Sequence, residues 1–158
     1  GQLGYYDKRH LFAFAGEDSV FESGKTQTIV SFKGWKINVQ ICFDLRFPEG
    51  ARNLIRDGNP AYDLLLYVAN WPSRRISHWD SLLLARAIEN QCYFLASAQG
   101  GMHQNQRQTW GQSMLIDPWG QIMQELATGE GFVIGQIHQE TLEGVRSKLP
   151  ALKHRKLS

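Results

Sequence analysis

Hydrophobic and polar positions alternate through the run of residues that ends at Cys42. Alternation with a period of two is typical of a β-strand with one buried face. A turn at Gly34 divides this region, so residues 31–41 are predicted to form two strand segments. Two further runs, residues 62–69 and 92–98, are almost continuously apolar, which is typical of strands covered on both faces. The middle of the chain therefore predicts a buried sheet.

Between these strands the spacing of apolar residues changes to that of helices. Residues 48–57 are predicted to form a helix that starts at a proline and stops at Gly58. A second helix is predicted for residues 77–90, which open on a Ser-His-Trp-Asp sequence typical of a capping box. A third, shorter helix is predicted for residues 139–148.

The last third of the chain is rich in predicted strands. Residues 113–116 and 121–126 are expected to pair as a hairpin, and residues 131–137 to form a last strand. Strands that alternate with helices and then dominate the end of the chain indicate a layered α/β architecture with mixed strand pairing. No repeat or linker interrupts the pattern, so residues 1–158 are interpreted as belonging to one domain.

Composition and charge exclude several classes of function. The 158 residues are 42% hydrophobic, and no apolar segment is long enough to cross a membrane. The formal charge of +2 is close to neutral, so no nucleic-acid partner is predicted. The two cysteines lack a CxxC spacing and the five histidines are scattered, which argues against a disulfide framework and a metal site. A reducing, cytoplasmic location is expected.

Cys42 stands where a nucleophile is expected. It ends a predicted strand and is followed by a turn that opens a predicted helix. A strand that ends in a sharp turn holds a side chain out above the sheet, and a helix start behind it directs N–H groups at a developing anion. Such a position is expected to lower the pKa of the thiol. The alternative is a buried core cysteine, which is the interpretation given to Cys92.

Four motifs stand in a fixed order along the chain: Tyr6-Asp7-Lys8-Arg9-His10-Leu11-Phe12, Glu17 before Gly24, Cys42-Phe43-Asp44-Leu45-Arg46-Phe47-Pro48, and Arg86-Ala87-Ile88-Glu89-Asn90-Gln91-Cys92-Tyr93. Together they resemble the nitrilase superfamily of carbon-nitrogen hydrolases. Residues 67–72 look like the omega-amidase branch, whereas residues 97–103 and 111–114 look like the deaminated glutathione amidase branch. The resemblance implies hydrolysis of the C–N bond of a small linear carboxylate-bearing amide, without a cofactor, and it leaves the substrate open between the two branches.

The resemblance also implies roles for particular residues. Cys42 corresponds to the nucleophile that forms a thioester, and Lys8 to the lysine that stabilises the oxyanion together with the backbone N–H of Phe43. Glu17 corresponds to the second glutamate of the family, although Glu22 is close enough along the chain to be the alternative.

Three residues are candidates for substrate binding. Asn70 and Trp71 follow a buried strand, where open α/β sheets bind their ligands, so they are expected in the pocket wall or in plain loop packing. Arg46 is expected either to bind a substrate carboxylate or to pair with Asp44 or Glu49.

For other polar residues a purely structural role is the alternative to a functional one. Glu89 is expected to form a structural ion pair with Arg86, and His103 to line the entrance or to lie in a solvated loop. His78 and Trp79 open a helix that lies at a subunit contact in the resembling family, which predicts a homodimer or higher homo-oligomer.

The resemblance is to the carboxyl-terminal part of the family domain. It implies a four-layer αββα sandwich of which this chain is the second half. The family's general-base glutamate lies well upstream of the lysine, and no residue before Lys8 corresponds to it. The alternative to an amidase is therefore a non-catalytic half-domain that acts only in assembly or ligand binding.

Overall fold

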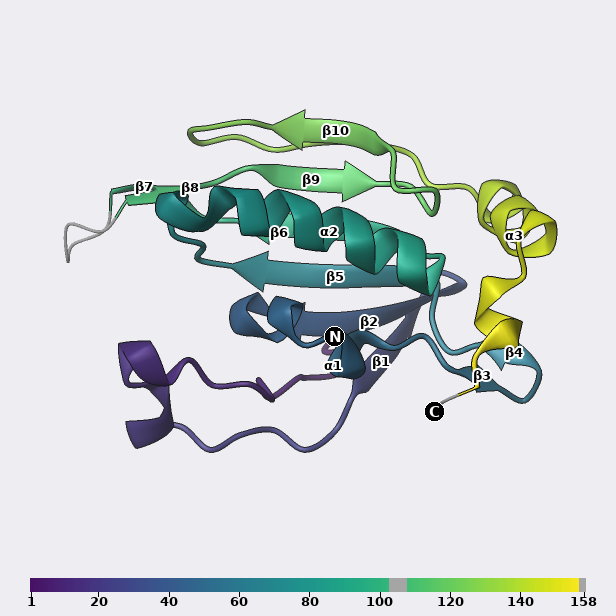
Figure 1. Ribbon diagram of the computed structural model, residues 1–158, viewed down its shortest axis with the longest axis horizontal. Helices are drawn as coiled ribbons and strands as arrows, with labels where there is room; N and C mark the ends of the chain where they lie inside the picture. Colours follow the sequence, from purple (N-terminus) through teal and green to yellow (C-terminus); the bar gives the residue numbers. More distant parts are fainter. Residues whose placement is uncertain (103–107, 157–158) are drawn as a thin grey trace.

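The computed structural model describes residues 1–102 and 108–156. Its centre is a six-stranded sheet in the order β1-β2-β5-β6-β9-β10 (Figure 1). The strands are β1 (Thr28–Phe32), β2 (Trp35–Ile41), β5 (Leu64–Ala69), β6 (Tyr93–Ala98), β9 (Ser113–Ile116) and β10 (Ile122–Leu126). The inner strands β2, β5 and β6 are parallel, whereas β1, β9 and β10 pair antiparallel. The layered α/β fold with mixed pairing is confirmed.

Helix α2 (Ile76–Asn90) covers one face of this sheet (Figure 1). Its buried residues Trp79, Leu83 and Ala87 share one apolar cluster with Leu65 and Phe94 of the sheet. The helix continues from a short 3-10 turn, η4 (Ser73–Arg75), so it starts one residue before the predicted capping box. No side chain caps its first turn.

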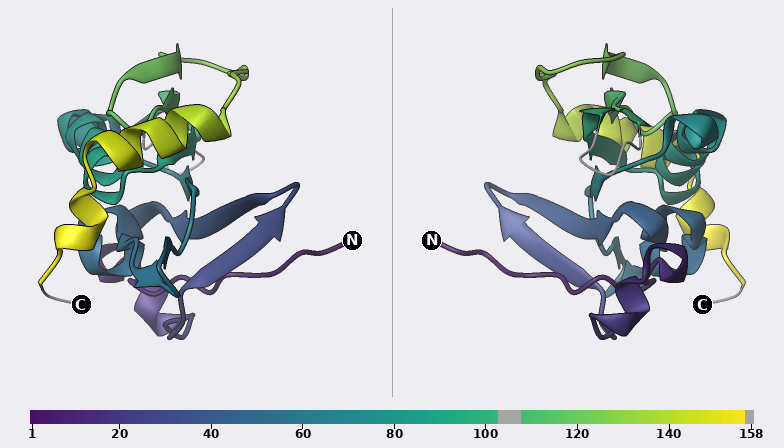
Figure 2. Two further views of the ribbon diagram at one scale, coloured as in Figure 1. Left: turned by 90° about the vertical axis from the view of Figure 1, so that its right-hand side faces the viewer. Right: turned by 90° about the vertical axis from the view of Figure 1, so that its left-hand side faces the viewer.

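The second face of the sheet is covered mainly at one end, by α3 (Gln139–Lys148). Leu142 of α3 packs against Leu64 and Tyr93 in a smaller apolar cluster. Elsewhere this face is open: Val68 lies in β5, between Ile41 and Ser97 of its neighbouring strands, yet is 44% exposed. In the two side views of Figure 2, the teal helix α2 lies on one side of the sheet, opposite to this second face.

The helix predicted for residues 48–57 is wrong beyond its first turn, because α1 spans only Pro48–Ala51. The buried side chain of Asn53 bonds the backbone N–H and C=O of Tyr62, nine residues further on, and these bonds hold the chain in a non-helical conformation. The chain then forms a small hairpin of β3 (Ile55–Arg56) and β4 (Asn59–Pro60). Asp57 and Gly58 form its turn with φ of 50° and 78°, as a two-residue hairpin with two left-handed residues requires. Gly58 is therefore a hairpin glycine and not a helix stop.

The hairpin of β9 and β10 and the helix over residues 139–148 are confirmed. The strand predicted for residues 131–137 is wrong, because this segment pairs with no strand. Phe132 and Ile134 are 81% and 74% exposed, whereas Ile137 packs against the smaller apolar cluster, so the segment lies on the domain without strand pairing. The remaining short elements are the pair β7 (Gly100–Met102) and β8 (Gln108–Trp110), and the 3-10 turns η1 (Ala13–Ala15), η2 (Glu17–Ser19), η3 (Cys42–Arg46) and η5 (Ala151–His154).

Candidate active site

Parallel pairing of β2 and β5 brings Cys42 and Asn70 to one end of the sheet. Ile41 is opposite Val68, so the residues that follow both strands emerge at the same edge, where open α/β sheets carry their sites. The short turns η1 and η2 lie toward this end of the molecule, and α3 lies at the other (Figure 1). Cys42 itself has φ of 46°, a left-handed conformation that is costly for a residue with a side chain. The predicted sharp turn after the strand is confirmed, although it opens a 3-10 turn, η3, instead of an α-helix.

A fully buried carboxylate, Asp44, holds this turn in place. It accepts hydrogen bonds from the backbone N–H of Ile41 (3.0 Å), the backbone N–H of His10 (2.9 Å) and the hydroxyl of Tyr6 (2.9 Å). The His10 ring lies 2.8 Å from the same carboxylate through Nδ1 and stacks on Phe47. Asp44 therefore ties the segment that carries Lys8 to the turn that carries Cys42. Sequence reasoning missed this role, although Asp44 lies in one quoted motif and Tyr6 and His10 in another.

Lys8 and Glu17 form an ion pair in which Nζ lies 2.5 Å from the carboxylate. Burial alone would raise the pKa of Glu17, but hydrogen bonds from Lys8 and from the backbone N–H of Phe12, with the charge of Lys8, lower it below its ordinary value. The backbone N–H of Gly24 bonds the carbonyl oxygen of Lys8 at 2.9 Å. A Cβ atom at Gly24 would overlap the carbonyl oxygen of Asp7, so the close approach of these segments requires glycine.

Cys42, Lys8 and Glu17 line one cavity of about 530 Å³. Asn70, for which a pocket wall and plain loop packing were the alternatives, lines it too, and so does the exposed Glu22. Its other lining residues are mostly apolar: Leu11, Phe21, Ile41, Val68 and Ala69, with Asp7 and Gln99. Of the two candidate glutamates, Glu17 is the one in contact with Lys8.

The pKa expected for Cys42 is corrected by the structure. Burial raises the pKa of the thiol, and the charge of Lys8 offsets this only in part. The thiol donates a hydrogen bond to the carbonyl oxygen of Asn70, at 3.6 Å from Sγ. Cys92 is fully buried, and burial raises its pKa to about 12, in agreement with its interpretation as a core residue.

The other substrate-binding candidates lie outside this cavity. Trp71 is 3% exposed, belongs to the main apolar cluster and donates through Nε1 to the carbonyl oxygen of Arg75. Arg46 pairs with neither of its expected carboxylates: its guanidinium lies 3.1 Å from Nδ1 of His78 and 5.0 Å from the centre of a Trp71 ring. Both residues line a separate cavity of about 30 Å³, which they share with Cys42. The ring of Phe43 lies 4.9 Å from that of Phe12, beside the nucleophile candidate.

The predicted structural pair is confirmed, because Arg86 lies 3.0 Å from Glu89 and donates to the carbonyl oxygen of Leu45 at 2.7 Å. Packing is also the role of Trp79, which is fully buried and donates to the carbonyl oxygen of Gln112. His103 lies outside the described residues.

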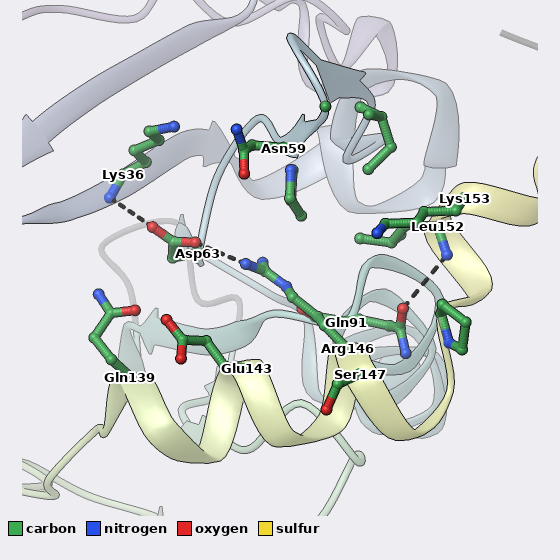
Figure 3. Close-up of a pocket in the computed structure, with 14 residues that line it drawn as sticks. Lys36, Asn59, Asp63, Gln91, Gln139, Glu143, Arg146, Ser147, Leu152 and Lys153 are labelled. Carbon is green, nitrogen blue, oxygen red and sulfur yellow. Dashed lines mark hydrogen bonds and ion pairs between the residues drawn. The ribbon is translucent and has the colours of Figure 1, made fainter.

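A second cleft, of about 370 Å³, lies where α3 and η5 meet the β3–β4 hairpin (Figure 3). Its central guanidinium is committed to the fold: Arg146 bonds Asp63 (2.9 Å) and the carbonyl oxygens of Tyr62 (2.7 Å) and Gln91 (3.0 Å). Asp63 also accepts from the backbone N–H of Lys36. The polar groups at the base of this cleft therefore hold α3 on the sheet.

Replacing Arg146 with methionine is expected to lower the free energy of unfolding by about 2–3 kcal/mol, because it leaves the mostly buried Asp63 carboxylate without its cationic partner and the Gln91 carbonyl oxygen without its Arg146 donor. Denaturant unfolding measures the loss. The control is Lys148→Met on the exposed side of the same helix, expected within about 0.5 kcal/mol of the parent. Equal stability of both variants would contradict the assigned role of Arg146.

Within residues 1–102 and 108–156, no group of three or more histidine, cysteine, aspartate or glutamate side chains is arranged to hold a metal ion. No helix in this described part of the chain is both long and apolar enough to cross a bilayer.

Comparison with known proteins agrees with the fold and the motifs. Residues 1–147 match the carbon-nitrogen hydrolase family. The chain is 42% identical over 155 residues to omega-amidase YafV of Escherichia coli K12, an alignment that covers 96% of this chain and 57% of that protein. It is 36% identical over 160 residues to human deaminated glutathione amidase, with 96% and 48% covered.

Among solved structures, XC1258 from Xanthomonas campestris, described as a CN-hydrolase superfamily protein with an arsenic adduct in the active site, superposes with a TM-score of 0.95. It is 42% identical, and the match covers 98% of this chain and 60% of that one. The chain belongs to the carbon-nitrogen hydrolase family and has the nitrilase-type fold. It spans about half the length of the relatives it matches, from 48% to 60% of the three named here.

Proposed function

We propose that this chain carries the nucleophile of an amidase that hydrolyses the C–N bond of a small linear carboxylate-bearing amide. The observation that carries the proposal is the meeting of Cys42, Lys8 and Glu17 in one cavity, with Cys42 on a left-handed turn at the end of a strand. Strain at such a turn is a recurrent feature of exposed nucleophiles.

In the proposed reaction the Cys42 thiolate attacks the amide carbon, and the carbonyl oxygen takes up the negative charge. The Lys8 ammonium and the backbone N–H of Phe43 stabilise this oxyanion, each contributing roughly 3–4 kcal/mol if it is well aimed. The C–N bond then breaks, the nitrogen takes a proton and leaves as ammonia, and an acyl thioester remains on Cys42. Water hydrolyses the thioester, which releases the acid and restores the thiol.

The raised pKa of Cys42 means that the first step needs a base to take the thiol proton. The family resemblance gives this role to a glutamate upstream of the lysine. We propose that Glu17 instead orients Lys8, because its carboxylate contacts that ammonium directly.

The substrate is proposed from the two kinds of relative. Similarity to omega-amidase YafV favours short 2-oxo acid amides, whereas similarity to deaminated glutathione amidase favours a longer substrate. We expect kcat/KM for the monoamide of oxoglutarate and kcat/KM for deaminated glutathione to differ by at least about tenfold. The larger value identifies the substrate class. Hydrolysis of neither would overturn the proposed substrate class.

A binding or assembly module is the second candidate, and the open sheet face around Val68 favours it. It predicts oligomer formation or ligand binding with no release of acid or ammonia. The two cysteines are free, which supports a reducing compartment. A cytoplasmic location and a homo-oligomeric state are further proposals.

A further inference from the structure

Charge is distributed unevenly around Cys42. The cavity of about 530 Å³ is lined by three carboxylates, Asp7, Glu17 and Glu22, and by the single ammonium of Lys8. Cys42 also lines the cavity of about 30 Å³, and it is the one lining residue that the two cavities share. The charged groups that line this smaller cavity are two guanidinium groups, those of Arg46 and Arg75. Cys42 therefore lies between a cavity whose charged residues are mainly acidic and a cavity whose charged residues are all basic.

The two guanidinium groups have no carboxylate partner within residues 1–102 and 108–156. Arg46 contacts His78 and the Trp71 ring, and Arg75 lies 5.9 Å from the centre of the Phe12 ring. Burial and the charge of Arg75 lower the pKa of Arg46, so the two cations are close enough to repel each other.

The backbone of Arg75 is firmly held. Its N–H donates to the carbonyl oxygen of Pro72 at 2.9 Å, and its own carbonyl oxygen accepts from Nε1 of the buried Trp71 at 2.8 Å. Among the described residues, 1–102 and 108–156, the side chain of Arg75 makes no hydrogen bond, and it lies against the Phe12 ring, which suits a guanidinium that binds a planar anion. An anion placed here would remove the repulsion between the two cations.

The space beside these groups is large enough for more than an anion. The small cavity shares Phe12, Pro72 and Arg75 with a further cavity of about 450 Å³, which Phe14, Arg74 and Gln108 also line. About 30 Å³ is the volume of one water molecule in the liquid, which is close to the size of the head of a carboxylate. The chain between the carboxylate and the amide then leads past Cys42 into the cavity of about 530 Å³, because Cys42 lines both that cavity and the small one.

We propose that Arg75 acts with Arg46 as the carboxylate-binding pair of the site and so determines which amides are accepted and how they are oriented. The carboxylate binds at the two guanidinium groups, and the uncharged amide faces Lys8 and Cys42. Carboxylates are thereby kept away from Glu17 and Glu22, where like charge would oppose binding. This inference rests on the proposed amidase function and adds a specificity determinant to it.

The first test uses alkylation of Cys42 and needs no turnover. Iodoacetate and iodoacetamide have similar shapes and differ in charge, so the ratio of their rates at Cys42 reports the local field. Arg75→Gln is expected to lower the iodoacetate to iodoacetamide ratio about 5- to 10-fold, because one of two nearby positive charges is lost. Arg75→Lys, which keeps the charge, is expected to retain most of the ratio.

The matched control is Arg74→Gln, which removes the same charge from the adjacent residue, outside the small cavity. Its ratio is expected to stay within about twofold of the parent. An unchanged ratio in Arg75→Gln, or an equal fall in both variants, overturns the proposal.

The second test compares succinamate with butyramide, two amides of the same length of which one carries a carboxylate. Arg75→Gln is expected to lower kcat/KM for succinamate about tenfold or more and to leave butyramide nearly unchanged. Equal losses on both amides overturn the specificity role. If the parent protein hydrolyses neither these two amides nor the monoamide of oxoglutarate nor deaminated glutathione, the amidase function fails, and the alkylation ratio still decides the role of Arg75.

Discussion

Replacing Cys42 with alanine is expected to abolish ammonia release, lowering turnover by at least about 10⁴-fold, with the fold retained. The reason is that the thioester cannot form, and loss of a nucleophile removes the reaction path itself. The side chain of Cys42 is partly exposed at the cavity, so its removal leaves no large buried hole. Circular dichroism and denaturant unfolding check the fold, and ammonia release checks the activity.

The chain provides its own control in the second cysteine. Cys92→Ala is expected to keep most of the activity and to lose only stability, since Cys92 is fully buried in the main apolar cluster. In the parent protein, brief treatment with limiting iodoacetamide is expected to label Cys42, because burial and a pKa of about 12 protect Cys92. Equal labelling of the two cysteines in folded protein, or full activity of Cys42→Ala, would contradict the assignment.

The parts of the fold that the sequence predicts best are those whose pattern is repeated over many residues. Residues 62–69 and 92–98 are almost continuously apolar, and they contain the central parallel pair β5 and β6. Residues 77–90 keep helical spacing for four turns and lie within α2. Continuous burial leaves these segments few alternatives.

Short segments are decided by contacts that a local pattern does not contain. The helix predicted for residues 48–57 ends early because Asn53 bonds Tyr62 and Asn90, which are distant along the chain. In contrast, the Asp57-Gly58 pair is a local signal for a two-residue hairpin turn. At this position the turn signal predicts the structure correctly and the helical spacing does not.

In the candidate site, too, local motifs predict some features and contacts between distant segments decide the others. The ordered motifs bring Cys42, Lys8 and Glu17 forward as candidates, and the structure gathers them in one cavity. Asn70 and Trp71 both follow β5, yet only Asn70 lines that cavity, because Trp71 is held in the core by its bond to Arg75. Which of two adjacent side chains points to a cavity depends on backbone torsion, and residue type alone does not determine it. Asp44 was missed because its partners, Tyr6 and His10, are more than 30 residues away.

The pKa of Cys42 was predicted with the wrong sign for a related reason. The charge of Lys8 lowers it, but burial raises it by more. Burial depends on the packing of the whole domain, whereas a nearby lysine is visible in a motif. The sequence-based expectation for the pKa of Cys42 therefore left out burial, which is the larger of the two opposing effects.

Replacing Lys8 with methionine is expected to lower turnover about 10²- to 10³-fold and to move the pH profile of Cys42 to higher pH. The loss of rate follows from removing one charged donor to the oxyanion. The shift follows from the sign of the charge: Lys8 favours the thiolate, so its removal raises a pKa that burial has already raised. At neutral pH the variant then holds still less thiolate than the parent.

Glu17→Gln separates this electrostatic effect from simple damage to the site. The negative charge of Glu17 raises the pKa of Cys42, so the variant is expected to move the alkylation profile to lower pH, opposite to Lys8→Met. Turnover is expected to fall in both variants, since Glu17 holds Lys8 at 2.5 Å. Rates of iodoacetamide labelling of Cys42 measured from about pH 6 to pH 10 give the two midpoints. Shifts in the same direction for both variants would show that Lys8 and Glu17 act on Cys42 through packing and not through charge.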